Sequence, residues 1–237
     1  MYRISDLLDY PADIELADID KDGDLDIFAT ARNSNDLVWL RNDGNKLDWP
    51  SFIIEENANT PLGIATGDID ADGNIDVALC SNGDAKLFWY KGDGKGGFSR
   101  RVIDPNLLNP REIKLVDFDK DGDLDAAVIC SNVANTVSLY INENATTWTR
   151  KILYTKRIGF DIEVGDLNKD GFPDLGAVFS AGSTSPNTGG IFWSGDGKGN
   201  FTILQGITTS NSVDMTAIKF ADVERWRSGC FVNLVFG

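Results

Sequence analysis

The chain has 237 residues, of which 42% are hydrophobic and 25% charged, and this ordinary globular composition argues against a disordered protein. Its 37 Asp and Glu outnumber its 22 Lys and Arg and give a formal net charge of −15, so nucleic acids and acidic membrane surfaces would be repelled. The sequence contains no His, which excludes catalysis of the Ser-His-Asp or Cys-His type and removes the commonest zinc and haem ligand.

A nine-residue acidic motif recurs along the chain and divides it into repeats. In each copy acidic residues alternate with other residues, and a glycine stands at the sixth position. The four copies occupy residues 18–26, 68–76, 117–125 and 166–174, so their starts are 50, 49 and 49 residues apart. A degenerate fifth copy begins at Asp222, where Glu224 and Trp226 replace the next two acidic positions. Self-similarity at a fixed period is the signature of a repeat architecture.

Each repeat predicts four short strands around its acidic motif. The first precedes the motif and has apolar residues at alternate positions, as at Ile14 and Leu16. The second is the apolar run after the motif, at residues 25–29, 75–79, 124–129 and 175–179. The third is an aromatic-rich run at residues 37–40, 87–90, 137–140 and 191–194, and turn signals such as Asn42-Asp43-Gly44 follow it. The fourth covers residues 52–54, 100–103, 149–153 and 201–204.

Four strands in about 50 residues are typical of a β-propeller blade. We therefore predict an all-β fold, a single β-propeller domain over residues 1–237 with five blades of four antiparallel strands. Ile4 precedes Asp18 by the same 14 residues that separate Ile54 from Asp68, so the N-terminal strand at residues 2–4 should complete the fifth blade. The chain ends 15 residues after Asp222. The last blade thus lacks its third strand, or the chain is cut short, or a neighbouring molecule fills the gap by self-association.

The alternating carboxylates indicate a metal site in each acidic motif. Two unit charges about 4 Å apart repel by roughly 4 kcal/mol at an effective dielectric constant of about 20, so several carboxylates in one loop need a counter-charge. Oxygen ligands at positions 1, 3, 5 and 9 and a glycine at position 6 suit Ca²⁺ rather than zinc or copper. At position 7 the fourth motif has Phe172, so the shared ligand there can only be the backbone carbonyl. We predict about four Ca²⁺ ions. The predicted ligand residues are Asp18, Asp20, Asp22, Asp24, Asp26, Asp68, Asp70, Asp72, Asn74, Asp76, Asp117, Asp119, Asp121, Asp123, Asp125, Asp166, Asn168, Asp170, Phe172 and Asp174.

Two other interpretations of the acidic motifs are less consistent with the sequence. An EF-hand needs a Glu at position 12 and flanking helices, whereas position 12 is Ala29, Leu79, Val128 or Ala177 and the flanks predict strands. Plain Asp-Gly turns would explain one or two Asp in each loop but not the alternation of three or four. The carboxylates at positions 1, 3, 5 and 9 number 15, four in each of the first three motifs and three in the fourth, which equals the net negative charge.

These motifs resemble FG-GAP and VCBS-type repeats, the calcium-loop blades of integrin alpha chains and of many bacterial surface and secreted proteins. The resemblance covers nearly the whole chain, although the literal Phe-Gly…Gly-Ala-Pro text of that family is absent. It implies that each loop joins the first and second strands of a blade on one face of the ring, and that the fifth unit binds no metal. It also implies an extracellular or cell-surface location, where weak calcium sites with dissociation constants of roughly 10⁻⁴ to 10⁻³ M are sufficient.

The resemblance further implies a ligand site on the face opposite the calcium loops. The segments expected there are residues 30–36, 81–86, 131–136 and 180–190, together with residues 55–63, 104–112, 154–160 and 206–214. They are rich in Asn, Ser and Gly, which suits hydrogen bonding to a sugar or to a protein loop and is also ordinary for loops. Trp39, Trp89 and Trp193 could stack on sugars, but their mid-strand position favours packing between blades.

Three functions follow as hypotheses from the sequence. The first is a non-catalytic, calcium-binding module for extracellular protein or carbohydrate. The second is a polysaccharide lyase or related carbohydrate-active enzyme, although no single loop gathers a base, a cation and an aromatic platform. The third is a structural or assembly unit. We expect no membrane insertion, because no run of 18 apolar residues occurs, and the given chain begins without the pattern of a signal peptide. The three cysteines, Cys80, Cys130 and Cys230, are expected to be buried free thiols.

Overall fold

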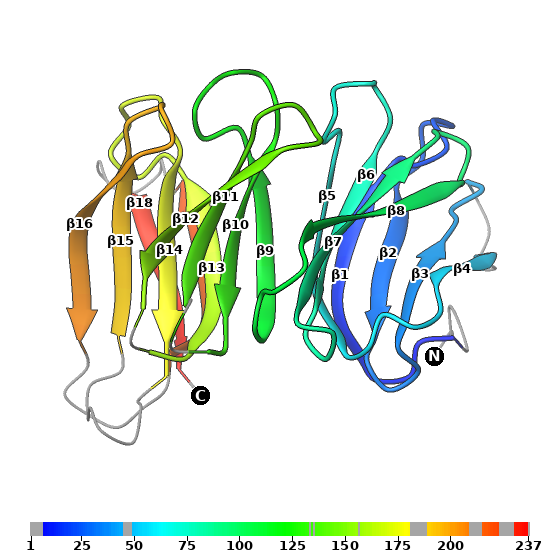
Figure 1. Ribbon diagram of the computed structural model, residues 1–237, viewed down its shortest axis with the longest axis horizontal. Helices are drawn as coiled ribbons and strands as arrows, with labels where there is room; N and C mark the ends of the chain where they lie inside the picture. The colour runs from blue at the N-terminus through cyan, green and yellow to red at the C-terminus, as the bar shows by residue number, and fades with distance from the viewer. Residues whose placement is uncertain are drawn as a thin grey trace. The chain divides into compact units, whose positions relative to one another are not determined.

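The computed structural model describes residues 7–44, 49–132, 134, 136–155, 157–180, 189–208, 215–222 and 230–236. Within these residues the chain forms strands and turns and no helix, so the all-β prediction is confirmed there (Figure 1). It follows that this described part offers no helix with the length and hydropathy of a membrane span. The chain divides into two compact units, Met1–Ile113 and Lys114–Gly237, and each is described by itself.

Four sheets of four strands and one sheet of two strands make up the described structure. The first sheet contains β1 (Pro11–Ala17), β2 (Asp26–Ala31), β3 (Asp36–Leu40) and β4 (Ser51–Glu55). The second contains β5 (Pro61–Gly67), β6 (Asp76–Ser81), β7 (Lys86–Gly92) and β8 (Phe98–Asp104). The third contains β9 (Pro110–Val116), β10 (Asp125–Cys130), β11 (Val137–Asn142) and β12 (Trp148–Tyr154). The fourth contains β13 (Gly159–Gly165), β14 (Asp174–Phe179), β15 (Gly189–Gly195) and β16 (Phe201–Thr208), and the two-stranded sheet contains β17 (Met215–Asp222) and β18 (Cys230–Phe236).

Each four-stranded sheet is an antiparallel meander whose strands lie side by side in chain order. The four predicted strands of each of the first four repeats are therefore confirmed. All four sheets share a register shift between the third and fourth strands, near Val38 in the first sheet and near Ser138 in the third. A bulge of this kind increases the local twist and makes the edge strand less able to pair with another chain.

The first strands alternate as the sequence predicts, but they do not all bury the same residues. Ile64, Ile162 and Ile218 are fully buried in β5, β13 and β17, whereas the equivalent Ile14 of β1 is 60% exposed and Leu16 is 55% exposed. Ile64 packs into the core that the first two sheets share. Among the described residues of the first unit, no sheet covers β1 in the same way. The alternation of apolar residues thus predicts the strand, but it does not predict whether another sheet covers that strand.

The tryptophans of the third strands lie in the cores. Trp39 is 3% exposed and belongs to the cluster between the first and second sheets, and Trp193 is 2% exposed and belongs to the cluster of the second unit. The ring of Trp193 meets Tyr154 of the neighbouring sheet edge to face, with 6.3 Å between ring centroids. These contacts confirm packing between sheets and exclude these rings as open stacking surfaces for sugar. Cys80 and Cys130 are buried free thiols, as predicted.

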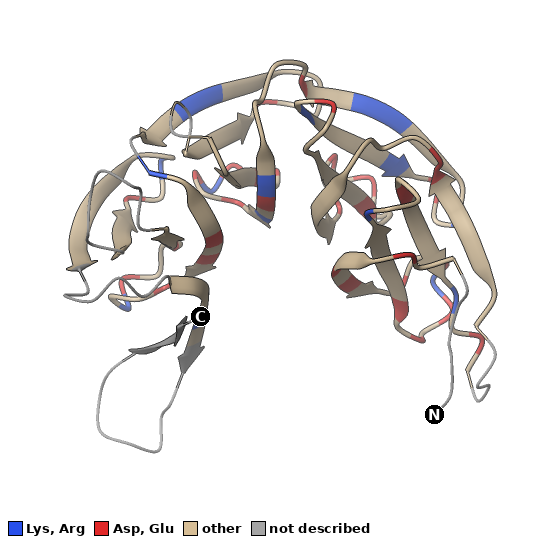
Figure 2. Cartoon of the chain, turned by 90° about the horizontal axis from the view of Figure 1, so that it is seen from below, with Lys and Arg blue, Asp and Glu red and all other residues tan. Residues whose placement is uncertain are grey.

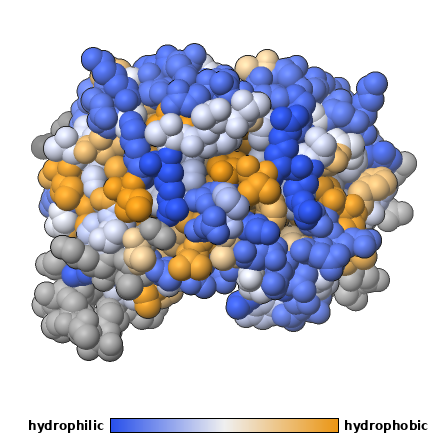
Figure 3. Space-filling view, viewed as in Figure 1, coloured by the Kyte–Doolittle hydropathy of each residue, from blue (hydrophilic) through white to orange (hydrophobic). Residues whose placement is uncertain are grey.

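The fourth strand of each large sheet carries exposed apolar side chains. Val102 of β8 is 50% exposed and Ile152 of β12 is 51% exposed, and apolar areas alternate with hydrophilic ones over these strands in Figure 3. The last repeat contributes β17, whose strand character the sequence predicts, and β18 pairs with it. The predicted closing strand at residues 2–4 and the substituted positions 224 and 226 lie outside the described residues, so the number of blades and the closure of a ring stay predictions.

Candidate metal centres

Four acidic loops, at residues 18–26, 68–76, 117–125 and 166–174, connect the first and second strands of the four large sheets. Figure 2 shows acidic residues in loops between strands in both units. Each loop has a positive φ at position 4, for example 62° at Lys21, and again at the glycine of position 6, for example 94° at Gly23. A Cβ on Gly23 would meet nothing within 4 Å, so backbone conformation and not crowding requires glycine there.

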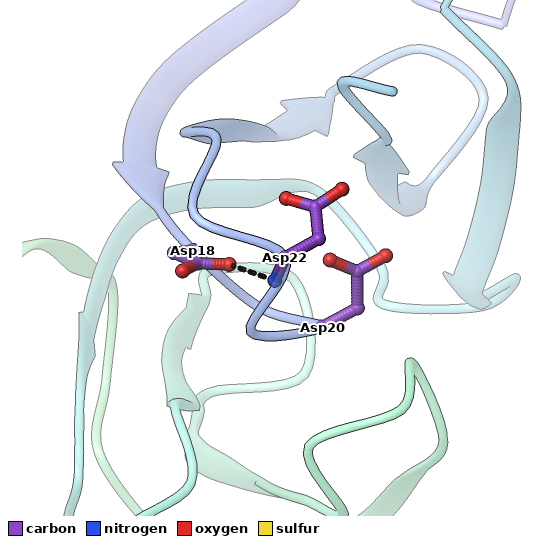
Figure 4. Close-up of side chains that lie close together, drawn as sticks. All are labelled: Asp18, Asp20 and Asp22. Carbon is purple, nitrogen blue, oxygen red and sulfur yellow. Dashed lines mark hydrogen bonds between the residues drawn. The ribbon is translucent and has the colours of Figure 1, made fainter. Parts of the chain in front are cut away.

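The carboxylate at position 1 holds each loop in a tight turn. Asp18 accepts hydrogen bonds from the backbone N–H groups of Asp22 and Gly23, both at 3.1 Å. Figure 4 shows the bond from Asp22. Asp68 accepts the equivalent two bonds in the second loop, at 3.0 and 2.8 Å. Asp166 accepts them in the fourth loop, at 3.1 and 2.9 Å. The backbone therefore folds back on the first carboxylate and brings positions 1, 3 and 5 together.

Three of the four loops bring at least three carboxylates together, with ligand atoms that lie within 4.8 Å of one another. The grouped residues are Asp18, Asp20 and Asp22 in the first loop, Asp68, Asp70 and Asp76 in the second, and Asp117, Asp119 and Asp125 in the third. Position 7 is predicted to bind through its backbone carbonyl, and its side chains make other contacts. The side-chain oxygen of Asn74 accepts a hydrogen bond from Lys21 at 2.8 Å, and the ammonium of Lys120 lies over the ring of Phe172 at 4.8 Å from its centroid.

The Asp at position 9 joins each loop to the rest of its sheet. Asp125 is fully buried and accepts hydrogen bonds from the backbone N–H of Phe118 at 2.8 Å and of Asn142 at 2.7 Å. Asp26, Asp76 and Asp174 accept the same pair of bonds in the other three loops. This residue is therefore a structural clamp between the loop and the end of the third strand, a role that the sequence analysis did not assign.

Burial of the position 9 carboxyls changes their acidity. Burial raises the pKa of Asp76 to about 6 and that of Asp125 to about 7, although the two backbone hydrogen bonds at each act in the opposite direction. Burial also raises the pKa of Asp26. The pKa of Asp20 is raised mainly by burial and next by the negative charge of Asp22. The pKa of Asp119 is raised mainly by burial and next by the negative charge of Asp121. A nearby cation would lower these values, because it favours the charged form of each carboxyl.

The fit of these loops to a metal ion can be tested on single atoms. The Oδ1 atoms of Asp20 and Asp70 are buried and accept no hydrogen bond, although a buried carboxylate oxygen without a partner is costly. Both residues occupy position 3, the centre of the alternating carboxylates. A hard cation with oxygen ligands would supply the missing partner. The donor set and these two unpartnered atoms therefore fit a bound Ca²⁺.

The second loop already contains a positive side chain. Lys91, at the end of β7, forms ion pairs with Asp70 and with Asp72, the latter at 2.7 Å. The hydrogen bond to Lys91 lowers the pKa of Asp72, and the bonds to Asp70 and Asp72 raise the pKa of Lys91. The sequence analysis missed this residue. Lys91 stands immediately before the residue that donates to the position 9 Asp, but the residues at this position in the four repeats share no type, so the sequence offers no signal for it.

The fourth loop replaces one carboxylate by an amide. Asn168 at position 3 donates hydrogen bonds from its side chain to Asp170 and to Ser194, both at 2.8 Å. Its backbone N–H donates to Asp174 at 3.1 Å. The fourth loop thus has one carboxylate fewer at positions 1, 3, 5 and 9 than the other three loops, and the neutral amide donates a hydrogen bond to Asp170, one of those that remain.

Polar residues at the opposite end of the first unit bind mainly to other loops. Asn35 accepts a hydrogen bond from the backbone N–H of Thr60 at 2.8 Å, and Ser81 donates to the carbonyl of Ala58 at 3.2 Å. Asn82 donates to the carbonyl of Pro110 at 3.0 Å. These contacts give the Asn and Ser of this end a structural role. Most of the predicted segments at residues 180–190 and 206–214 lie outside the described residues.

Comparison with known proteins identifies the repeats. The sequence model of a family described as FG-GAP-like repeat matches the chain at residues 18–79, 68–128 and 117–177. Each match begins at position 1 of an acidic loop and ends in the second strand of the following sheet, namely β6, β10 or β14. The matches together cover more than half of the chain. None of the curated proteins matches it.

Proposed function

The chain belongs to the FG-GAP-like repeat family, and we propose that it is a non-catalytic, calcium-binding module with a β-propeller-like arrangement of its sheets. The single observation that carries the calcium proposal is the pair of buried, unpartnered carboxylate oxygens at Asp20 and Asp70. They lie in loops whose other carboxylates are within reach of one ion. When bound, Ca²⁺ would supply the positive charge that these loops need.

The residues that would hold the ion follow from the loop geometry. The carboxylates of positions 1, 3 and 5 would bind it in the first loop, and those of positions 1, 3 and 9 in the second and third loops. The fourth loop has Asn168 in place of a carboxylate, so it offers fewer negative charges and should bind calcium most weakly of the four. The five-bladed arrangement with about four ions is part of the proposal, and the repeated four-stranded sheets support it.

We further propose that the module acts outside the cell and binds a protein or a carbohydrate through the end opposite the acidic loops. The family membership supports this location. In each large sheet the second strand ends and the third strand begins at that opposite end, because the strands alternate in direction. The loops there are held by hydrogen bonds between them, which provides a rigid surface for a ligand.

Calorimetry and thermal melting test the calcium proposal. We expect metal-free protein to take up about four Ca²⁺ at millimolar concentrations and to melt at a higher temperature when calcium is present, because a ligand that binds only the folded state stabilises it. A sample that takes up no calcium and melts at the same temperature with and without it would overturn the proposal. A screen against glycans and matrix proteins, in calcium and in chelator, tests the ligand, and binding at background level would contradict that part.

A further inference from the structure

We infer that Lys91 is a built-in counter-ion of the second acidic loop, which calcium must displace before it binds there. This inference rests on the proposed calcium binding. The Lys91 ammonium pairs with the carboxylates of Asp70 and Asp72, at positions 3 and 5 of the loop. Both contacts use Oδ2 atoms, and Asp70 belongs to the group of carboxylates that lie close enough to share one ion. A carboxylate oxygen that pairs with an ammonium must give up that ion pair before it can coordinate calcium.

No lysine ammonium stands at the equivalent position of the other three loops. Arg41 lies at this position in the first repeat, but its guanidinium pairs with Asp43 outside the loop, at 2.6 Å. In the third repeat the residue is Ile141, which is apolar and buried. In the fourth it is Ser194, which accepts a hydrogen bond from Asn168. Among the described residues, the second loop therefore stands out as the one with an ammonium between two of its own predicted ligands.

The ammonium satisfies the loop only in part. It brings one positive charge and three donors, whereas Ca²⁺ brings two charges and takes six to eight oxygen ligands. The Oδ1 atom of Asp70 stays buried and unpartnered beside it. Calcium at sufficient concentration should therefore still displace Lys91. The second loop should then bind calcium more weakly than the third, and its turn should depend less on calcium for stability.

Space exists for the displaced side chain. A pocket of about 540 Å³ borders the loop and is lined by Asp72, Asn74, Lys91, Gly92 and Phe98 among others. The Lys91 side chain is 26% exposed and faces this pocket. The ammonium can thus move into solvent without any change in the sheet, and calcium can enter by the same route.

Lys91→Met separates this role from a merely structural one, because the two expected effects have opposite signs. Without calcium, the variant should melt about 2–5 °C lower, since Asp70 and Asp72 lose their counter-ion. In calcium titrations of ¹⁵N-labelled protein, the second loop should bind roughly three- to thirtyfold more tightly, since no ion pairs must break. The amide of Gly73 reports this loop, because it donates to Asp68, and Gly122 reports the third loop.

Two further variants serve as controls. Lys91→Arg keeps the charge and should retain the weak affinity, and Arg41→Met should change the affinity of the first loop less, because Arg41 pairs outside it. Equal calcium affinity of Gly73 in the wild type and in Lys91→Met would overturn the inference, while calcium binding at the other loops still supported the proposed function. If calcium changed the amide signal of none of the four loop glycines in the wild type, the inference and the proposed function would both be wrong.

Discussion

The carboxylate of Asp13 in β1 accepts a hydrogen bond from the backbone N–H of Ile64 in β5, at 2.9 Å, and so connects two neighbouring sheets of the first unit. Asp161 of β13 makes the equivalent bond to the N–H of Ile218 in β17, also at 2.9 Å. In both cases the other carboxylate oxygen accepts from the next residue of the same strand. One short side chain thus fixes the spacing between consecutive first strands.

Asp161→Ala should destabilise the protein by about 1–3 kcal/mol, because the N–H of the fully buried Ile218 loses its acceptor. For a chain of this size the melting temperature should fall by roughly 2–4 °C for each kcal/mol, as measured by circular dichroism. Asp9→Ala is the control, since Asp9 is exposed and should change the melting temperature by less than about 1 °C. Equal effects of the two substitutions would show that the bond between the sheets contributes nothing.

This bond could not be predicted from the repeat. The residue that precedes the first-strand isoleucine is Asp13, Gly63, Glu112, Asp161 or Ala217 in the five units, so no pattern marks it. The strands, by contrast, could be predicted almost completely, because alternation and turn residues are local signals. The exposure of Ile14 depends on whether another sheet covers β1, which is a tertiary property that local signals do not contain.

Asp125→Ala should be strongly destabilising even without calcium. The substitution removes the acceptor of two buried N–H groups, those of Phe118 and Asn142, and should cost about 2–4 kcal/mol in urea unfolding of the metal-free protein. Asp121→Ala, at the exposed position 5 of the same loop, should cost less than about 1 kcal/mol under the same conditions. Its effect should instead be weaker calcium binding, because the loop loses a negative charge that acts on Asp119 although Asp121 is not in the closest group of ligands. If both variants lost the same stability without calcium, the clamp role of Asp125 would be wrong.

The position 9 carboxyls should make calcium binding dependent on pH. Their folded-state pKa values, about 6 for Asp76 and about 7 for Asp125, lie above the ordinary Asp value of about 3.9. In metal-free protein these groups therefore contribute stability that is fully present below about pH 4 and is lost as the pH rises through 6 and 7. Calcium needs the deprotonated form, so its affinity should increase over the same range.

Thermal melting at pH 5 and pH 8 measures this effect. The increase in melting temperature caused by millimolar calcium should be several degrees larger at pH 8, with the metal-free sample prepared by dialysis so that chelator chemistry does not change with pH. Asp125→Asn removes one titrating group and should reduce the difference between the two pH values. The same calcium-induced increase at pH 5 and pH 8 would contradict the expected proton release.

The candidate sites show a similar division between local and tertiary information. The ligand types and their spacing could be recognised from the sequence, because a tight loop requires alternation and a glycine at a fixed position. The pairing of Lys91 with Asp70 and Asp72 could not, because the lysine lies 19 residues beyond Asp72 and reaches the loop only through the register of β6 and β7. Register is what converts sequence distance into contact.

The close approach of first strands is also testable at a glycine. A Cβ on Gly63 in β5 would lie 2.7 Å from the carbonyl oxygen of Arg111 and 2.7 Å from the Cα of Glu112, and both are backbone atoms that cannot rotate away. Gly63→Ala should therefore cost about 1–3 kcal/mol through overpacking, measured by urea unfolding. In Gly190→Ala the nearest atom would be 3.4 Å away, an ordinary contact, so this control should change the stability little. A Gly63 variant as stable as the Gly190 variant would mean that the backbones of β5 and β9 separate at negligible cost.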